Sequence, residues 1–250
     1  MRREEEFKLE LMKVLNKFSG EGDSNTPDFI LMEIEIHSLY WPNTNPEIVE
    51  SHKKVMKHFE LPCNYHEKQI DHGLWMDEVL RSAKTEIVIF FDIDCVPISK
   101  EKFIEYIKYV HKNKTFLGIA QVSNHIAPAQ HVYAAPAFYI IDKMFYNKLN
   151  VSFSAQKFGD VGEMITYYAE KERYTYRCLY PTHYYDESTE GLWKLHNYGW
   201  YGVGTVFDNN IFHLYQSRFD RNVNLFKTVC DNIINDNFSF NNFQSATRLN

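Results

Sequence analysis

The chain has 250 residues, of which 44% are hydrophobic, 24% charged and 16% aromatic, and its formal net charge is −6. This composition is typical of a folded domain and excludes a disordered or low-complexity chain. The acidic balance also lacks the strongly basic character of most nucleic-acid-binding proteins. The four cysteines contain no Cys-x-x-Cys pair, so they predict neither a zinc site nor a dense disulfide framework and favour a reducing compartment.

No apolar run approaches the ~20 residues of a membrane span, and the acidic start MRREEEF lacks the apolar core of a signal peptide. We therefore expect a cytoplasmic protein without a membrane span. Residues 1–18 carry apolar side chains at the spacing of one helix face, and a polar, Gly-containing stretch follows. Residues 1–26 are thus predicted to be a helix and a linker. The helix is interpreted either as a packed accessory element or as an arm through which the chain forms an oligomer.

The next part of the chain alternates between strand and helix patterns. The predicted elements are a strand at Phe29–His37, a helix at Glu47–Phe59, a strand at Leu61–His66, a helix at His72–Lys84 and a strand at Ile87–Phe91. This succession is typical of an α/β domain, which we expect to cover residues 27–234 around a central, mostly parallel sheet flanked by helices.

The remaining elements are predicted from the same patterns. Helices are expected at Lys100–Lys112, Asp142–Leu149 and Val161–Lys171, and strands at Thr115–Ala120, Tyr133–Ile141, Tyr174–Leu179 and Phe207–Tyr215. Residues 181–204 are expected to be a long, aromatic-rich loop of the kind that often forms a functional lid. Residues 235–250 are Asn-rich and polar, and we expect this C-terminal tail to fray.

The sequence IVIFFDIDCVP, residues 87–97, is the most specific functional feature. Asp92 and Asp94 follow a continuous apolar run that suits a strand buried on both faces. Ligands of open α/β sheets bind beyond the carboxyl ends of the strands. Burying two carboxylates there without a cation is unfavourable, and a hard divalent ion that shares phosphate oxygens would relieve that penalty. Asp-x-Asp alone is a common pattern, and the apolar run and Pro97 on either side make it specific.

Residues 72–107, HGLWMDEVLRSAKTEIVIFFDIDCVPISKEKFIEYI, resemble the nucleotide-sugar-dependent glycosyltransferases of the GT-A fold, nearest to the family 2 type. In that family a Gly-containing helix leads into a buried strand that ends in Asp-x-Asp, and a proline and a helix follow. The resemblance implies a GT-A-like (Rossmann-like) domain that binds Mn²⁺ or Mg²⁺ and a nucleotide-diphosphate sugar. Asp94 would be the direct metal ligand, and Asp92 would lie closer to the ribose or the sugar.

The same family places an acidic residue at the start of a helix beside the acceptor. The segment FGDVGEMITYY contains Asp160 and Glu163, with Gly159 in place of the first member of the family's Glu-Asp pair. Asp160 is the first candidate, and Glu163 the second, for the general base that deprotonates the acceptor hydroxyl. Such a base predicts an inverting reaction. Helix capping is an equally open interpretation, with Asp160 as the N-cap and Glu163 three residues later.

Further candidates come from the resemblance and from residue chemistry. Many GT-A enzymes bring a late histidine to the metal, and His213 follows an apolar strand. Lys194 and Arg218 are candidate diphosphate partners, since cations there stabilise the leaving group. Trp193 is a candidate for stacking on a sugar or base, and His37 lies where the family's first strand ends and the nucleobase is held. Each residue is also interpretable as ordinary packing or as solvated surface charge.

A second class shares part of the pattern. Phosphatases of the haloacid dehalogenase type also use a strand followed by Asp-x-Asp, with Asp92 as nucleophile, Asp94 as acid and base, and Asp160 as a magnesium ligand. Those enzymes usually carry the motif on their first strand, whereas α/β pattern precedes it here. A non-catalytic metal- or nucleotide-binding domain is a third hypothesis. We favour a metal-dependent transferase whose hydroxyl acceptor is a glycan, a lipid, a small molecule or a modified nucleobase in DNA.

Overall fold

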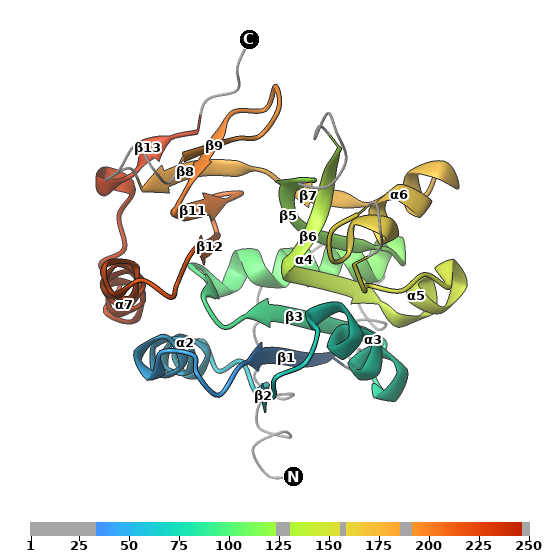
Figure 1. The fold of residues 1–250 in the computed structure, drawn as a ribbon, viewed down its shortest axis with the longest axis horizontal. Helices are drawn as coiled ribbons and strands as arrows, with labels where there is room; N and C mark the ends of the chain where they lie inside the picture. The colour runs from blue at the N-terminus through green and yellow to red at the C-terminus, as the bar shows by residue number, and fades with distance from the viewer. Residues whose placement is uncertain (1–33, 124–130, 156–158, 186–191, 247–250) are drawn as a thin grey trace, which may run out of the picture.

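The computed structural model describes residues 34–123, 131–155, 159–185 and 192–246 (Figure 1). The predicted N-terminal helix and linker, and the oligomer contact attributed to them, lie outside the described residues. No helix in the described part of the chain has the length and apolar character needed to cross a membrane.

A six-stranded sheet forms the centre of the protein. In spatial order its strands are β2 (Cys63–Glu67), β1 (Ile34–Tyr40), β3 (Ile87–Asp92), β6 (Val132–Asp142), β5 (Phe116–Val122) and β7 (Arg177–Leu179). The pairings of β1 with β2, β1 with β3 and β5 with β7 are parallel, while β6 runs antiparallel to both of its neighbours. The prediction of an α/β protein with a central, mostly parallel sheet is confirmed.

Helices cover both faces of this sheet. The helices are α2 (Pro46–His58) and α4 (Lys100–Asn113) on one face, and α3 (His72–Ser82), α5 (Lys143–Leu149) and α6 (Glu163–Lys171) on the other. Residues 87–91 of β3 are all apolar, and their packing shows why. Ile87, Ile89 and Phe91 pack into the first layer, whereas Val88 and Phe90 pack into the second. A strand buried on both faces has no solvent-facing position for a polar side chain.

A second, antiparallel sheet lies beside the first. Its strands, in order, are β13 (Gln244–Ser245), β8 (Pro181–Tyr185), β11 (Gly204–Phe207), β12 (Ile211–Leu214) and β4 (Cys95–Pro97). Helix α7 (Asp220–Ile234) covers it and also packs against α2 (Figure 1). A separate hairpin joins β9 (Leu192–Lys194) and β10 (Trp200–Gly202).

The C-terminal half corrects three sequence expectations. The predicted loop over 181–204 contains β8, β9 and β10, because its aromatic side chains pack on the second sheet and on one another. The predicted single strand at Phe207–Tyr215 is a hairpin of β11 and β12, whose turn holds Asp208 and Asn209 at φ 48° and 55°. Residues 235–246 are not frayed, since they form a short 3-10 helix at Phe240–Asn242 and pair through β13 with β8.

The Asp-x-Asp segment lies where the two sheets meet. Strand β3 belongs to the first sheet and β4 to the second, so the chain passes from one to the other between Asp92 and Cys95. In the order β2-β1-β3, the chain first moves outward from β1 to β2 through α2 on one face of the sheet, and then returns through α3 on the other face to β3. The direction in which strands are added to the sheet therefore reverses between β1 and β3. This point of an α/β sheet is where ligands bind.

Candidate functional site

Three side chains converge at the junction of the two sheets. Asp92 ends β3, Asp94 directly precedes β4, and His213 lies in β12 opposite Cys95 of β4. One ligand atom from each of Asp92, Asp94 and His213 lies within 4.8 Å of the others, and His213 Nε2 is 3.5 Å from Asp94 Oδ1. Two carboxylates and an imidazole suit a divalent ion such as Mn²⁺ or Mg²⁺, whose remaining ligand positions phosphate or water can fill.

The electrostatics of Asp92 also point to a cation. Burial raises the pKa of Asp92; His72 and His213 oppose this rise, and the neighbouring charge of Asp94 adds to it. The ionised form of Asp92 is therefore disfavoured in the absence of a cation. A divalent ion would offset both the burial and the repulsion between the two carboxylates.

His72 is a further residue at this site, and no sequence motif marks it. It is the first residue of α3, and its Nε2 lies 3.4 Å from Asp92 Oδ1. The preceding Asp71 caps the helix by accepting a hydrogen bond from the Leu74 amide at 2.9 Å. His72 reaches the site because the start of α3 lies at the same edge of the sheet as the end of β3. Its role depends on topology, and the sequence marks it only as the start of the predicted helix.

A cleft of about 210 Å³ adjoins the carboxylates. Residues from the end of β1 and the loop that follows it line the cleft together with His72 and the Asp-x-Asp segment. The lining residues are Leu39, Tyr40, Trp41, Thr44, His72, Asp92, Ile93 and Asp94. We use the name metal group for Asp92, Asp94 and His213, the residues that could hold a metal ion. Trp41 leaves 46% of its surface exposed, so an aromatic face is available to a ligand beside the metal group.

His37 occupies a different position from the one expected. It is not among the described residues that line this cleft. Its imidazole is 7% exposed and lies between two partners, with His66 Nε2 at 3.0 Å and Glu35 Oε2 at 3.1 Å. Burial lowers the pKa of His37. Since both ring nitrogens are engaged, the geometry does not support a nucleobase contact through His37.

Glu163 has a structural role at the start of α6. It is 1% exposed; its Oε2 accepts a hydrogen bond from the Asp160 amide at 2.9 Å, and its Oε1 lies 2.8 Å from His131 Nδ1. The N-cap position is Gly162, at φ 79°, and not Asp160. Glu163 therefore satisfies a backbone amide at the start of α6, as the capping interpretation predicts, whereas the Asp160 side chain does not cap the helix.

The Asp160 carboxylate faces a group of tyrosines. The hydroxyl of Tyr133 is hydrogen bonded to it, and burial, followed by the charge of Asp160, raises the pKa of Tyr133. Burial and Asp160 likewise raise the pKa of Tyr201 to about 12. Both phenols are therefore protonated at neutral pH and can donate a hydrogen bond toward Asp160 or a nearby hydroxyl group.

An aromatic wall connects this carboxylate with the metal group. We use this name for Trp193, Tyr201 and Tyr215, whose rings pack on one another with centroids 5.4–5.6 Å apart. The Tyr215 ring lies 4.2 Å from the ring of His213. Trp193 thus contacts Tyr215, which in turn contacts His213 of the metal group. Tyr215, which no sequence motif marks, links His213 to Trp193 and Tyr201.

Backbone packing holds the Asp160 segment in place. Gly73 of α3 lies so close to residues 153–154 that a Cβ would come within 2.5 Å of Ser154 Cα and 2.6 Å of Phe153 carbonyl carbon. The Phe153 carbonyl in turn accepts a hydrogen bond from the Gly162 amide at 2.8 Å. Gly73, which the resemblance includes as part of a Gly-containing helix, is therefore required by a close approach of two backbones.

The two candidate cations lie at the surface. Arg218 is exposed, with its guanidinium carbon 5.3 Å from the centre of the Phe219 ring, and Lys194 is exposed in β9. No contact recorded for the described residues brings either side chain to Asp92 or Asp94. Their assignment to the diphosphate remains a prediction.

No protein-family model matches the sequence, and no curated protein is similar to it. Solved structures do match in fold. A mannosyltransferase from Pyrobaculum calidifontis in complex with GDP-Man and Mn²⁺ matches with a TM-score of 0.43 and 11% identity, over 69% of this chain and 62% of that one. The protein A197 from STIV matches with a TM-score of 0.42 and 10% identity, over 74% and 95% of the two chains.

Other matched structures vary in activity. They include a glycosyltransferase involved in glycosylation of the major capsid of PBCV-1, with a TM-score of 0.32 and 17% identity over 46% of this chain and 62% of that one. They also include a thymidylyltransferase from Bacillus anthracis. The similarity concerns the fold alone.

Proposed function

We propose that the chain is a metal-dependent glycosyltransferase that moves a sugar from a nucleotide-diphosphate sugar to a hydroxyl acceptor with inversion. The convergence of Asp92, Asp94 and His213 beside a cleft at the switch point of the sheet is the observation that carries the proposal. A Mn²⁺ or Mg²⁺ ion held there would neutralise the charge that develops on the departing diphosphate.

The cleft suits the nucleoside end of such a donor. Tyr40 and Trp41 offer aromatic surface for a base, and Thr44 also lines the cleft. Asp92 lines the same cleft as Tyr40 and Trp41, which agrees with a position near the ribose or the sugar. His72, whose Nε2 lies 3.4 Å from Asp92 Oδ1, would help to orient this carboxylate.

Asp160 is the proposed base. As the acceptor oxygen attacks the anomeric carbon, its proton passes to the Asp160 carboxylate, and the bond to the diphosphate oxygen breaks on the opposite side. Tyr133 and Tyr201 would hold the acceptor or orient the carboxylate, while Trp193 offers a face for a sugar ring. Glu163 is left out of the chemistry because its two oxygens already hold His131 and the Asp160 amide.

The structure gives less support to the phosphatase alternative. In the central sheet β1 and β2 precede the motif-bearing β3 along the chain. Asp160 lies between α5 and α6 along the chain, and does not directly follow an apolar strand as the corresponding phosphatase motif does. The phosphatase hypothesis still predicts a different product, which makes it testable.

The decisive experiment supplies UDP, GDP, ADP and CMP sugars with Mn²⁺ and follows the products. Release of a nucleoside diphosphate (or of CMP from its sugar) that requires both Mn²⁺ and Asp94 supports the transferase. Release of inorganic phosphate from small phosphoesters, without turnover of any sugar nucleotide, would favour the phosphatase. Binding without any turnover in the presence of simple glycan acceptors would favour a non-catalytic domain.

A further inference from the structure

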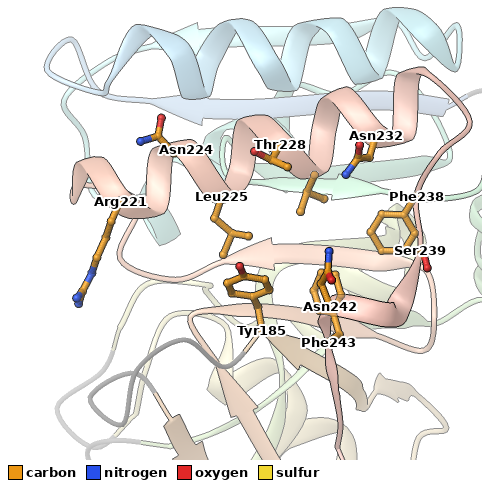
Figure 2. A pocket seen from close by; sticks show the side chains of 11 residues that line it. Tyr185, Arg221, Asn224, Leu225, Thr228, Asn232, Phe238, Ser239, Asn242 and Phe243 are labelled. Carbon is orange, nitrogen blue, oxygen red and sulfur yellow. The ribbon is translucent and has the colours of Figure 1, made fainter.

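A second cleft, of about 250 Å³, lies between α7 and residues 238–243 (Figure 2). We call it the α7 cleft. Figure 2 shows Leu225 of α7 directed toward Tyr185 of β8, with Asn242 and Phe243 beside it. The α7 cleft shares no lining residue with the cleft beside Asp92 and Asp94. The proposed transferase chemistry therefore gives it no role.

The polar lining is almost uncharged. Asn224, Thr228 and Asn232 recur every four residues along α7, which places them on one helix face, and Asn242 lies across from them. Arg221 is the one cation among the described lining residues, and none of those residues is acidic. Each asparagine amide both donates and accepts hydrogen bonds. The lining thus suits a ligand that carries many neutral groups able to do both.

The floor of the cleft is apolar and fixed. Phe243 packs against Phe212, Phe238 and Tyr185, with ring centroids 6.3, 5.8 and 5.7 Å away. Phe212 belongs to the buried core under the second sheet. The aromatic faces are therefore held in position before any ligand arrives, which lowers the entropy lost on binding.

We propose that the α7 cleft binds a neutral sugar unit of a glycan. A pyranose ring has hydroxyl groups around its edge, which match the asparagines and Thr228, and apolar C–H faces, which pack on Phe238 and Phe243. A cationic ligand finds no carboxylate among the described lining residues. An anionic ligand finds the single guanidinium of Arg221. Such a site would hold a glycan on the protein independently of the donor.

The test is a titration of the isotope-labelled chain followed by NMR. The probes are the methyl glycosides of glucose, galactose, mannose and N-acetylglucosamine, with glucuronic acid and inorganic phosphate as charged comparators. We expect at least one neutral glycoside to shift the side-chain amide signals of Asn232 and Asn242 saturably. Lack of any shift with all four glycosides, or shifts with the charged probes alone, would overturn the proposal.

Variants locate the site. Asn242→Ala removes one amide and is expected to weaken binding about fivefold, and Thr228→Trp fills the cleft from an exposed helix position and abolishes binding. Asn241→Ala is the matched control, because Asn241 is an exposed neighbour that does not line the cleft. Equal loss in Asn241→Ala and Asn242→Ala would contradict the assignment.

Asp94→Asn separates this inference from the proposed function. That variant should keep the response of the α7 cleft to the glycosides while losing metal-dependent donor binding. If its glycoside response disappears, the sugar binds at the other cleft and the inference is wrong.

Discussion

Replacing Asp94 by asparagine changes the charge of the metal group and almost nothing of its shape. The Asp94 side chain is 15% exposed and lies 3.5 Å from His213. Without a cation, its negative charge adds to the burial that raises the pKa of Asp92. Asp94→Asn removes this repulsion, so we expect the metal-free variant to be at least as stable as the unmodified protein.

With ligand present, we expect the unmodified protein to be more stable than Asp94→Asn. A ligand at a hundredfold excess over its Kd stabilises the folded state by about 2.7 kcal/mol. For a chain of this length each kcal/mol raises Tm by about 2–4 °C. Mn²⁺ with the matching sugar nucleotide should therefore raise the Tm of the unmodified protein by about 5–10 °C. Asp94→Asn should lose this increase, because one of two negatively charged ligands is gone.

The assay is thermal unfolding with and without Mn²⁺ across the sugar-nucleotide panel. Asp236→Asn is a suitable control, since Asp236 is exposed at φ 56°, a conformation that asparagine also adopts. It should keep the full increase in Tm. A full metal-dependent increase in Asp94→Asn would refute the metal assignment, and a lower metal-free Tm would refute the electrostatic argument.

Three further outcomes are expected. Gly73→Ala places a Cβ 2.5 Å from Ser154 Cα, and the free energy of unfolding in urea should fall by about 1–3 kcal/mol. Burial lowers the pKa of His52 from 6.5 to about 3, so the unfolded chain takes up a proton first as the pH falls. As the pH falls from 7 to 4.5, His52 should therefore lower the free energy of unfolding by about 2.5 kcal/mol. In urea titrations, the free energy of unfolding of His52→Gln should fall less steeply over this pH range than that of the unmodified protein. In kinetic assays Asp160→Asn should lower kcat with donor binding intact, whereas Glu163→Gln should mainly lower stability, by about 1–3 kcal/mol.

A different result in each experiment would contradict the corresponding prediction. An unchanged unfolding free energy in Gly73→Ala would mean that α3 moves freely away from residues 153–154. An equally steep pH slope in His52→Gln would assign the acid sensitivity to other groups. Loss of donor binding in Asp160→Asn would indicate a structural role, and a large fall in kcat for Glu163→Gln at unchanged stability would transfer the base to Glu163.

The strand and carboxylates of the candidate site can be predicted from sequence because their signals are local. The apolar run Ile87–Phe91 marks a strand buried on both faces, and the two aspartates follow it directly. The helices α2, α3 and α4 begin and end within two residues of their predicted bounds, since a capping side chain or proline marks each start.

Residues whose role depends on distant contacts could not be predicted in this way. His72 and Tyr215 become part of the site through the meeting of α3 with β3 and of β12 with β10 and β9. The hairpin at Phe207–Ile211 did carry a local signal, Asp208-Asn209, which is typical of a turn with positive φ. Helix α7, for which no element was predicted, carries Val223, Phe226, Cys230 and Ile233 at helical spacing.

The close backbone approach at Gly73 lies between the two parts of the proposed active site. His72, which lies beside Asp92, directly precedes Gly73, whose backbone closely approaches that of Ser154. The neighbouring Phe153 carbonyl accepts a hydrogen bond from the Gly162 amide, two residues after Asp160. The path is made of backbone contacts, so a displacement of α3 would reach residues 153–162 with few flexible side chains in between. In the proposed transferase this path would favour ordered addition, with the donor binding first and the acceptor meeting an Asp160 carboxylate already in position.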